Sequence, residues 1–301
     1  MSNALQDAVA APSPNTAADG HEGTPFVASL PFWGVHAACL LAFWAGWSWI
    51  ALLTCAAAYF VRMFGVTAVY HRYFSHRTYK TSRPVQFVLA VIGTSAVQKG
   101  PLWWAAHHRV HHRYADTDKD VHSPTVRGFW WSHVGWILSN KYDETKWELI
   151  RDFAKFPELR FLNRYHLLTA VAMALGMFGF GALLNHSFPS LHTSGLQMLA
   201  WGFFVSTTLL YHGTFSINSL SHVFGRRRFQ TKDTSRNSFV LSLITLGEGW
   251  HNNHHRYPAS ERQGFYWWEI DITHYILRML SWARLVWDLR EPPQYIYAEA
   301  E

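Results

Sequence analysis

Residues 49–76 read WIALLTCAAAYFVRMFGVTAVYHRYFSH, an apolar run that ends in the histidine pair His71 and His76. Up to Tyr70 this run contains a single charged residue, Arg62. As an α-helix, the segment 49–70 would be about 33 Å long, enough to cross the ~30 Å hydrocarbon core of a bilayer. The stretch therefore predicts a membrane-spanning helix that delivers histidines to one surface of the membrane.

Two long runs without Asp, Glu, Lys or Arg, 23–61 and 165–225, extend this pattern. Each is longer than one span requires, and each is interrupted, the first by Gly46-Trp47-Ser48 and the second by the polar stretch 185–195. Each run therefore predicts a helical hairpin. The expected spans are 31–46, 49–70, 164–184 and 196–220.

The basic residues predict the orientation of these hairpins. Neither hairpin turn contains Lys or Arg, and all of these residues lie in 62–164 and 226–301. The positive-inside rule places both segments in the cytoplasm, and an even number of spans places both termini there. We expect an all-α integral membrane protein with four transmembrane helices in two hairpins and a cytoplasmic helical cap.

The composition agrees with a membrane protein. Charged residues make up 15% of the chain, against about 25% in soluble domains. The net charge of +6 suits either nucleic acid or an anionic membrane surface, and the spans favour membrane lipid and no nucleic acid. The two cysteines, Cys39 and Cys55, lie in apolar stretches and indicate neither a disulfide framework nor a thiolate metal site.

We expect one domain over 29–290, between a disordered N-terminal tail (1–28) and a C-terminal tail (291–301). Residues 84–98 are apolar but short for a span, so we expect a juxtamembrane or buried helix there. The segment 141–164 mixes basic and aromatic residues, which predicts an interfacial helix.

Histidine is unusually frequent, with 19 residues, and eight of them form three clusters in the segments assigned to the cytoplasm. The clusters are His71 and His76; His108, His111 and His112; and His251, His254 and His255. The spacing i, i+3, i+4 of the second and third clusters places three imidazoles on one helical face. His71 is expected on a helix end and His76 in the chain that leaves it. Imidazole suits iron, copper and zinc, so the pattern predicts a metal site.

Most of the other histidines are more typical of packing or of the membrane interface. These are His21, His36, His166, His186, His192, His212 and His274. His107, His122 and His133 stay undecided between packing and function.

The three clusters, written HRYFSH (71–76), HHRVHH (107–112) and HNNHH (251–255), resemble the histidine boxes of the membrane fatty acid desaturases. GFWWSHVGWIL at 128–138 and GEGWHNNHHRYP at 247–258 are also similar to that family. The resemblance is to the acyl-CoA and acyl-lipid Δ9 desaturases of stearoyl-CoA type, and covers about residues 30–290.

The resemblance implies oxygen-dependent desaturation of a saturated long-chain fatty acyl group, bound to coenzyme A or to lipid. It implies two Fe²⁺ ions as cofactor, O2 as co-substrate, and electrons from a ferredoxin or b-type cytochrome fed by an NAD(P)H reductase. It also implies a ninth histidine ligand, His222, and an asparagine that holds a metal-bound water, Asn218. Their i, i+4 spacing puts both residues on one helical face.

Several residues near the boxes are candidates for a supporting role. The carboxylates of Asp116, Asp118, Asp120 and Glu248 either orient ligand imidazoles or are solvated loop charges. Trp103 and Trp104 suit either the wall of an acyl tunnel or packing at the membrane belt. The basic run 226–228, with Lys232, suits lipid phosphates, the phosphates of an acyl carrier or anchoring of the helix end.

One departure from the family concerns the acyl carrier. Animal acyl-CoA desaturases carry an Arg-Asp pair just before the second box, where this chain has Ala106 and His107. Coenzyme A recognition is therefore in doubt.

If His222 is not a metal ligand, His107 is the next candidate to complete the metal site.

Two other functions are compatible with histidine clusters. A membrane di-iron hydroxylase of alkyl or carotenoid substrates differs only in the fate of the substrate radical. A metal transporter would place its ligands near the bilayer midplane, whereas these histidines lie just outside the expected spans. The box spacings favour the desaturase.

Overall fold

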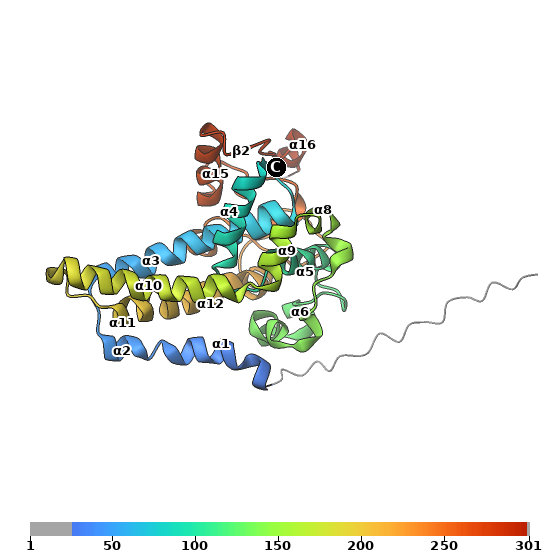
Figure 1. Ribbon diagram of the computed structural model, residues 1–301. Helices are drawn as coiled ribbons and strands as arrows, with labels where there is room; N and C mark the ends of the chain where they lie inside the picture. The colour runs from blue at the N-terminus through green and yellow to red at the C-terminus, as the bar shows by residue number, and fades with distance from the viewer. Residues whose placement is uncertain (1–25, 300–301) are drawn as a thin grey trace, which may run out of the picture.

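The computed structural model describes residues 26–299, and this part of the chain is mostly helical (Figure 1). Long helices lie side by side at one end of the molecule, and shorter helices gather at the other (Figure 1). Residues 1–25 of the predicted N-terminal tail lie outside the described part of the chain. Residues 26–28 begin the first helix.

The first predicted hairpin is present as two helical arms that meet at Gly46, whose positive φ of 68° suits glycine. Ser48 begins the second arm, because its Oγ accepts a hydrogen bond from the backbone nitrogen of Ala51 at 3.2 Å. The second arm continues without a break from an α-helix into a π-helix. The elements are α1 (Phe26–Ala38), α2 (Leu41–Ala45), α3 (Trp49–Phe64) and the π-helix η1 (Gly65–Ser75).

The second hairpin turns at His192, which has a left-handed backbone (φ 48°). Its first arm, α10, has only Ala170 and Gly181 buried, and a helix that is apolar and exposed on nearly all sides suits a lipid environment. The elements are α10 (Leu167–Ser187), η5 (Pro189–Leu191), α11 (Gly195–Met198), the π-helix η6 (Leu199–Val205) and α12 (Ser206–Ser219).

Two helices of the described chain, Trp49–Ser75 and Leu167–Ser187, are long and apolar enough to cross a bilayer. Arg62, the charge inside the first of them, is buried and donates to Thr207 Oγ1 at 2.7 Å and to Ser206 Oγ at 2.6 Å. These hydrogen bonds join α3 to α12 and satisfy a cation that apolar surroundings would otherwise exclude.

The cap contains the remaining elements of the described chain. Its helices are α4 (Arg83–Thr94), α5 (Pro101–Tyr114), α6 (Pro124–Arg127), η2 (Trp131–Gly135), α7 (Trp136–Leu138), η3 (Asn140–Tyr142), η4 (Trp147–Leu149), α8 (Arg151–Ala154), α9 (Pro157–Arg164), η7 (Leu220–His222), α13 (Phe239–Ile244), α14 (His251–Arg256), α15 (Ile272–Trp282) and α16 (Gln294–Ala298). Two-residue strands, β1 (Lys80–Thr81) and β2 (Val286–Trp287), pair antiparallel with Lys80 opposite Trp287. Apart from this pair, the described chain is helical or irregular, in agreement with the all-α part of the expected class.

The structure corrects two expectations about the cap. The predicted single interfacial helix over 141–164 is divided into η3, η4, α8 and α9, and Pro157 starts the last of these, since proline fits the first turn of a helix but not its interior. The segment 291–299 is not a free tail: Ile296 in α16 is fully buried and packs in a cluster with Phe229 and Phe265. The predicted helix within 84–98 is present as α4.

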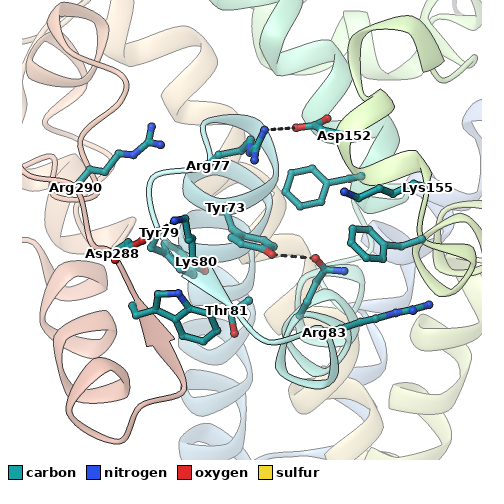
Figure 2. Close-up of a pocket in the computed structure, with 14 residues that line it drawn as sticks. Tyr73, Arg77, Tyr79, Lys80, Thr81, Arg83, Asp152, Lys155, Asp288 and Arg290 are labelled. Carbon is teal, nitrogen blue, oxygen red and sulfur yellow. Dashed lines mark hydrogen bonds and ion pairs between the residues drawn. The ribbon is translucent and has the colours of Figure 1, made fainter.

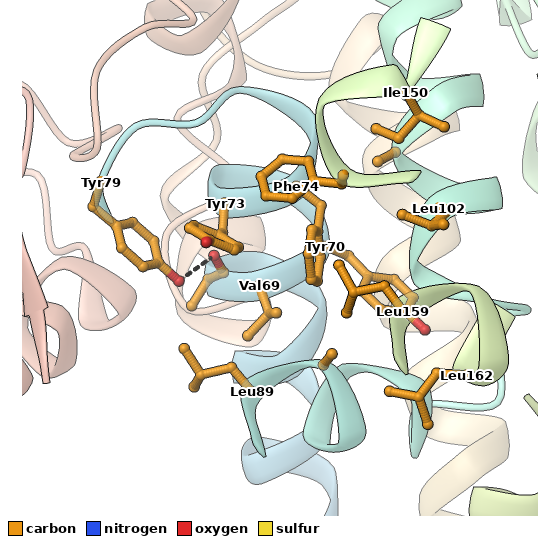
Figure 3. Packing of buried hydrophobic residues seen from close by; sticks show 14 of the residues in the cluster. Val69, Tyr70, Tyr73, Phe74, Tyr79, Leu89, Leu102, Ile150, Leu159 and Leu162 are labelled. Atoms are coloured by element: carbon orange, nitrogen blue, oxygen red, sulfur yellow. Dashed lines mark hydrogen bonds between the residues drawn. The ribbon is translucent and has the colours of Figure 1, made fainter. Parts of the chain in front are cut away.

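An apolar core holds η1 in place. Tyr70 and Phe74 of η1 pack with Leu102 of α5, and with Ile150 and Leu159 of the segments that follow (Figure 3). This packing fixes the orientation of η1. The histidines of the first box, His71 and His76, therefore lie on the side of η1 opposite to this core.

Candidate metal centre

Four elements bring the predicted histidines together in the cap. His71 lies in η1, and His76 is the residue that ends this helix, as predicted. The second box lies on α5, the third box on α14, and His222 is the last residue of η7.

In space the histidines of the three boxes and His222 form two new groups, called the first and the second cluster from here on. Five histidines form the first cluster, with ligand nitrogens all within 4.8 Å of one another. They are His71, His76, His108, His112 and His254. The Nε2 atom of His254 lies 2.9 Å from the Nε2 atoms of both His71 and His112. The Nε2 atoms of His76 and His108 are 3.0 Å apart.

Four histidines form the second cluster under the same distance limit: His111, His222, His251 and His255. The Nε2 atoms of His222 and His251 are 3.1 Å apart. The two clusters therefore bring together all nine histidines named from the sequence, including His222, which belongs to none of the three boxes.

In four of these imidazoles, the other ring nitrogen, Nδ1, faces a carboxylate. The pairs are His71 with Glu248, His111 with Asp120 at 3.0 Å, His222 with Asp116 at 3.0 Å, and His255 with Asp233 at 2.9 Å. Because a carboxylate only accepts, it holds a ring proton on Nδ1, which leaves Nε2 as the nitrogen that can offer its lone pair to a metal ion. Such carboxylate–histidine pairs are the usual support of a metal ligand.

The carboxylates are held in their ionised form. Burial alone would raise the pKa of Asp116, but hydrogen bonds from His222, Ser123 and Thr234 hold that pKa well below its usual range. The pKa values of Asp120 and Asp233 are also lowered, against the effect of burial, by their histidine partners. Each pair therefore presents a negative charge behind its imidazole at neutral pH.

The sequence predicted three of these four carboxylates. Asp233 was missed, because it precedes the third box by a long stretch of chain and no motif surrounds it. Asp118, also proposed as a support, is exposed. The remaining candidates, Asp116, Asp120 and Glu248, all contact a clustered histidine.

The facing nitrogen atoms of the two clusters are better suited to binding metal ions than to hydrogen bonding with one another. Burial lowers the pKa of five histidines well below the ordinary value, so these rings are neutral: His76, His108, His112, His251 and His254. Nε2 of His111 and of His255 are buried without a hydrogen-bond partner in the described chain. Buried polar atoms normally find a partner. Both of these nitrogens belong to the second cluster, where a cation would supply that partner.

A buried network behind the first cluster was also missed from the sequence. Arg72, adjacent to His71, contacts Glu248 at 3.2 Å and Asp271 at 3.0 Å, and Gln263 donates to Glu248 at 3.0 Å. These contacts fix Glu248 on His71. They join segments that are nearly 200 positions apart, so the only local signal was the position of Arg72 inside the first box.

The undecided histidines fall in three different places. His107 lies outside both clusters: its Nδ1 is 2.9 Å from the carbonyl oxygen of Trp103, and burial lowers its pKa to about 4. His122 adjoins the second cluster, in a group with His111 and Asp120. His133 contacts Ser219 Oγ at 2.9 Å.

A small cavity of about 30 Å³ adjoins both clusters, with His71 and His108 of the first and His111 and His251 of the second in its lining. Asn218 lines the same cavity. A volume of this size holds about one water molecule or another very small ligand. Trp104 forms another wall, stacked on His108 with ring centroids 5.0 Å apart.

The fold and this centre define a class of helical protein with apolar helices of membrane-spanning length and histidine clusters suited to metal ions, and sequence comparison specifies the family. The profile of the fatty acid desaturase family matches residues 47–287. The chain is 38% identical over 266 residues to Delta-9 acyl-lipid desaturase 1 of Arabidopsis thaliana, covering 86% of this chain and 81% of the relative.

Two further relatives have similar coverage. Identity is 34% over 259 residues with the sn-1 stearoyl-lipid 9-desaturase of Anabaena variabilis, covering 85% of this chain and 90% of the relative. It is 36% over 268 residues with the acyl-CoA C20 Delta5-desaturase of Anemone leveillei, covering 87% of this chain and 80% of the relative. The chain therefore belongs to the fatty acid desaturase family, and it is an oxidoreductase that desaturates fatty acyl chains. The hydroxylase alternative is not favoured.

Proposed function

We propose that this desaturase introduces a double bond at the Δ9 position of a saturated long acyl chain and uses two iron ions at the two histidine clusters. The observation that carries the proposal is the pair of adjoining all-nitrogen clusters, four of whose imidazoles are backed by carboxylates. Two relatives named as 9-desaturases, from Arabidopsis thaliana and Anabaena variabilis, support the Δ9 position.

In this proposal, His71, His76, His108, His112 and His254 hold one ion, and His111, His222, His251 and His255 hold the other. Asn218 lines the small cavity beside both clusters, from where it would hold a metal-bound water molecule. Redox-active irons would supply the oxidant that takes hydrogen from an unactivated methylene group, which no side chain can do and redox-inert zinc cannot support.

The chain's own residues position the substrate and limit the water beside the clusters. Met63, Val66 and Trp104 form apolar walls of the small cavity, which leaves room for about one water molecule. An apolar groove of about 590 Å³ lies between α3 and α12, with Tyr59 and Leu209 in its lining. Such surfaces suit a saturated chain, whose recognition depends on shape and burial rather than on hydrogen bonds.

The reaction must be supplied with electrons. Formation of the double bond takes two hydrogen atoms from the acyl chain, and reduction of O2 to two water molecules consumes four electrons and four protons. Two electrons and two protons must therefore come from elsewhere, and we propose a ferredoxin or a b-type cytochrome, served by an NAD(P)H reductase, as the electron donor.

A groove of about 670 Å³ is suited to such a donor, because His112 and His255 line it. Arg113, Arg228 and Lys232 lie around the same groove and would attract an acidic partner. Arg228 and Lys232 belong to the basic stretch for which the sequence left several roles open.

We propose a membrane lipid rather than coenzyme A as the acyl carrier. Ala106 and His107 stand where animal acyl-CoA desaturases have an Arg-Asp pair, and both are buried here. They can offer no charged group to a carrier at the surface. The acyl-lipid names of the Arabidopsis and Anabaena relatives agree with this choice, while the Anemone relative is named for acyl-CoA.

We also propose four membrane spans, with the metal centre and both termini in the cytoplasm. Two helices, Trp49–Ser75 and Leu167–Ser187, are long and apolar enough to cross a bilayer, and α10 is exposed on nearly all sides, which supports this proposal. The absence of Lys and Arg from both turns supports the orientation.

The decisive experiment expresses the protein in a host that lacks unsaturated fatty acids and locates the new double bond by mass spectrometry. A Δ9 double bond in lipid-bound acyl chains is the expected result, and a His254→Ala variant serves as the inactive control. A hydroxylated product would contradict desaturation. A double bond at another position would contradict the Δ9 assignment alone, and activity only on acyl-CoA would contradict the lipid carrier.

A further inference from the structure

A second cleft, with a cavity of about 360 Å³, lies on the outer side of η1, away from the metal centre. None of the clustered histidines lines it. Figure 2 shows Lys155 and Arg83 on one side of this cleft and Lys80 and Arg290 on the other, with Tyr73 and Arg77 between them. The five cations come from three separate parts of the chain, so their convergence is a property of the fold.

Positive charge in the cleft exceeds negative charge, although Arg83 is already paired with Glu158, outside the lining, at 2.7 and 2.8 Å. The two lining carboxylates are Asp152 and Asp288. Asp152 is already held by both terminal nitrogens of Arg109, at 3.0 and 2.9 Å, and lies 3.7 Å from Arg77. Asp288 pairs with Lys80 at 2.7 Å, but both side chains are more than half exposed. Such an exposed ion pair contributes little to stability, so it does not hold Lys80 firmly.

Two of the cations have no acidic partner within residues 26–299. The ammonium group of Lys155 lies over the ring of Phe156, 5.2 Å from its centroid, and makes no ion pair. The side chain of Arg290 has none either, although its backbone is fixed on both sides by hydrogen bonds to Thr78 and Glu261. Both residues are exposed, and their charged groups are available to an anion.

The floor of the cleft has a free donor as well. Gln86 lines the cleft and is almost fully buried; its amide oxygen accepts from the hydroxyl of Tyr73 at 2.9 Å. Its amide nitrogen has no hydrogen-bond partner in the described chain. A buried N–H donor without a partner is uncommon, and beside free cations it suits the oxygen atoms of a ligand.

The border of the cleft is apolar. Trp287 lines the cleft and is 42% exposed. Further exposed apolar side chains follow on the neighbouring elements, with Val88 on α4, Met279 and Trp282 on α15, and Leu285 just before β2. Figure 1 shows α4, α15 and β2 gathered at one side of the molecule. Cations beside exposed aromatic and aliphatic side chains are typical of a surface that meets lipid headgroups.

We propose that this cleft binds the phosphate of an anionic phospholipid, whose acyl chains lie along the apolar surface of α4 and α15. The site is separate from the metal centre and holds the cap against an anionic leaflet. A free phosphate would have the same charge, but it would leave the apolar border unused, so the proposal is for the lipid.

The test uses the iron-loaded full-length protein in an uncharged detergent. Binding of a short-chain phosphatidylglycerol is measured by calorimetry and compared with short-chain phosphatidylcholine, inorganic phosphate and coenzyme A. The double variant Lys155→Gln/Arg290→Gln is expected to weaken phosphatidylglycerol binding about 30-fold, from roughly 1 kcal/mol for each cation at a lipid surface. Neither substitution leaves a carboxylate unpaired, so the fold should tolerate both.

Two controls accompany the double variant. Lys155→Arg/Arg290→Lys keeps both charges and is expected to retain binding. Arg160→Gln removes an exposed arginine of α9 outside the cleft and is expected to bind as the unaltered protein does. Equal binding of phosphatidylcholine, or unchanged binding by the double variant, would overturn the proposal. Tighter binding of inorganic phosphate or coenzyme A than of phosphatidylglycerol would also overturn it, in favour of a free anion or an acyl carrier.

Discussion

Asp233 accepts a hydrogen bond from Nδ1 of His255 at 2.9 Å, and so fixes the ring of a histidine whose Nε2 faces the second cluster. The carboxylate is itself held by the backbone nitrogen of Ser235 at 2.9 Å and by the hydroxyl of Thr231 at 3.0 Å. The loop before α13 therefore acts on the metal centre through one carboxylate.

Removal of this carboxylate should loosen the second iron. We expect Asp233→Ala to weaken iron retention about 10- to 100-fold, the usual effect of losing a carboxylate behind a ligand histidine. Iron content is measured after dialysis against graded chelator concentrations. Asp118→Ala, which removes an exposed carboxylate, is the matched control, and equal iron retention by the two variants would contradict the assigned role.

Substitution of His222 tests whether this residue is a metal ligand or an ordinary polar residue at the end of a helix. His222→Ala should lose metal and activity together, with the iron content falling from about two ions towards one per chain, because His222 is one of four nitrogen donors at the second cluster. His107→Ala is the control, since His107 lies outside both clusters. Retention of two irons and near-normal turnover in His222→Ala would remove this residue from the ligand set.

Asn218 is expected to act through water and not as a direct ligand. Asn218→Ala should keep most of the iron but slow turnover about 10- to 100-fold, in line with losses beyond the direct ligands. Iron analysis and product formation are measured on the same preparation. Loss of iron comparable with that of His222→Ala would instead make Asn218 a direct ligand, and unchanged turnover would leave it without a catalytic role.

His107 should make stability depend on pH. Burial lowers its pKa from the ordinary 6.5 to about 4 in the folded protein. The unfolded chain therefore takes up a proton near pH 6.5 while the folded chain does not, so stability is full above 6.5 and is lost as the pH falls towards 4. The loss at pH 5 is about 2 kcal/mol.

His107→Gln removes this contribution. The unfolding temperature of the metal-free variant should fall less between pH 7 and pH 5 than that of the metal-free unaltered protein. Identical pH dependence of the two proteins would contradict the prediction.

The topology is tested by labelling single cysteines from each side of the membrane. Ser190→Cys in η5 and Asp118→Cys in the cap are introduced into a Cys39→Ser/Cys55→Ser background. We expect a membrane-impermeant thiol reagent to reach them from opposite sides, because the hairpin turn lacks basic residues and the cap contains them. Labelling of both from one side would contradict the four-span arrangement.

The sequence by itself determined where the long helices lie and which histidines are candidate metal ligands. Hydrophobic runs depend on local composition, so the arms of both hairpins were predicted within a few residues. The i, i+3, i+4 spacing placed the imidazoles of α5 and α14 on one face for the same local reason. The division of 141–164 into short helices was missed, although Pro157, which starts α9, is a local signal for one of these boundaries.

Only the tertiary structure decided how the histidines divide between two sites. Along a helix, positions i and i+4 differ by about 40° in one sense, and i and i+3 by about 60° in the other. His108 and His112 accordingly face the first cluster and His111 the second, while His251 and His255 face the second and His254 the first. Each helix passes between the two sites, so a single box serves both.

The supporting carboxylates also divide into those that the sequence indicated and one that only the tertiary structure reveals. Asp116 and Asp120 come soon after the second box, and Glu248 comes just before the third, so the sequence offered them as candidates. Asp233 reaches His255 only because the chain after η7 folds back over α14. Such a contact depends on the path of the whole chain, since a hydrogen bond requires atoms about 3 Å apart whatever their separation in sequence.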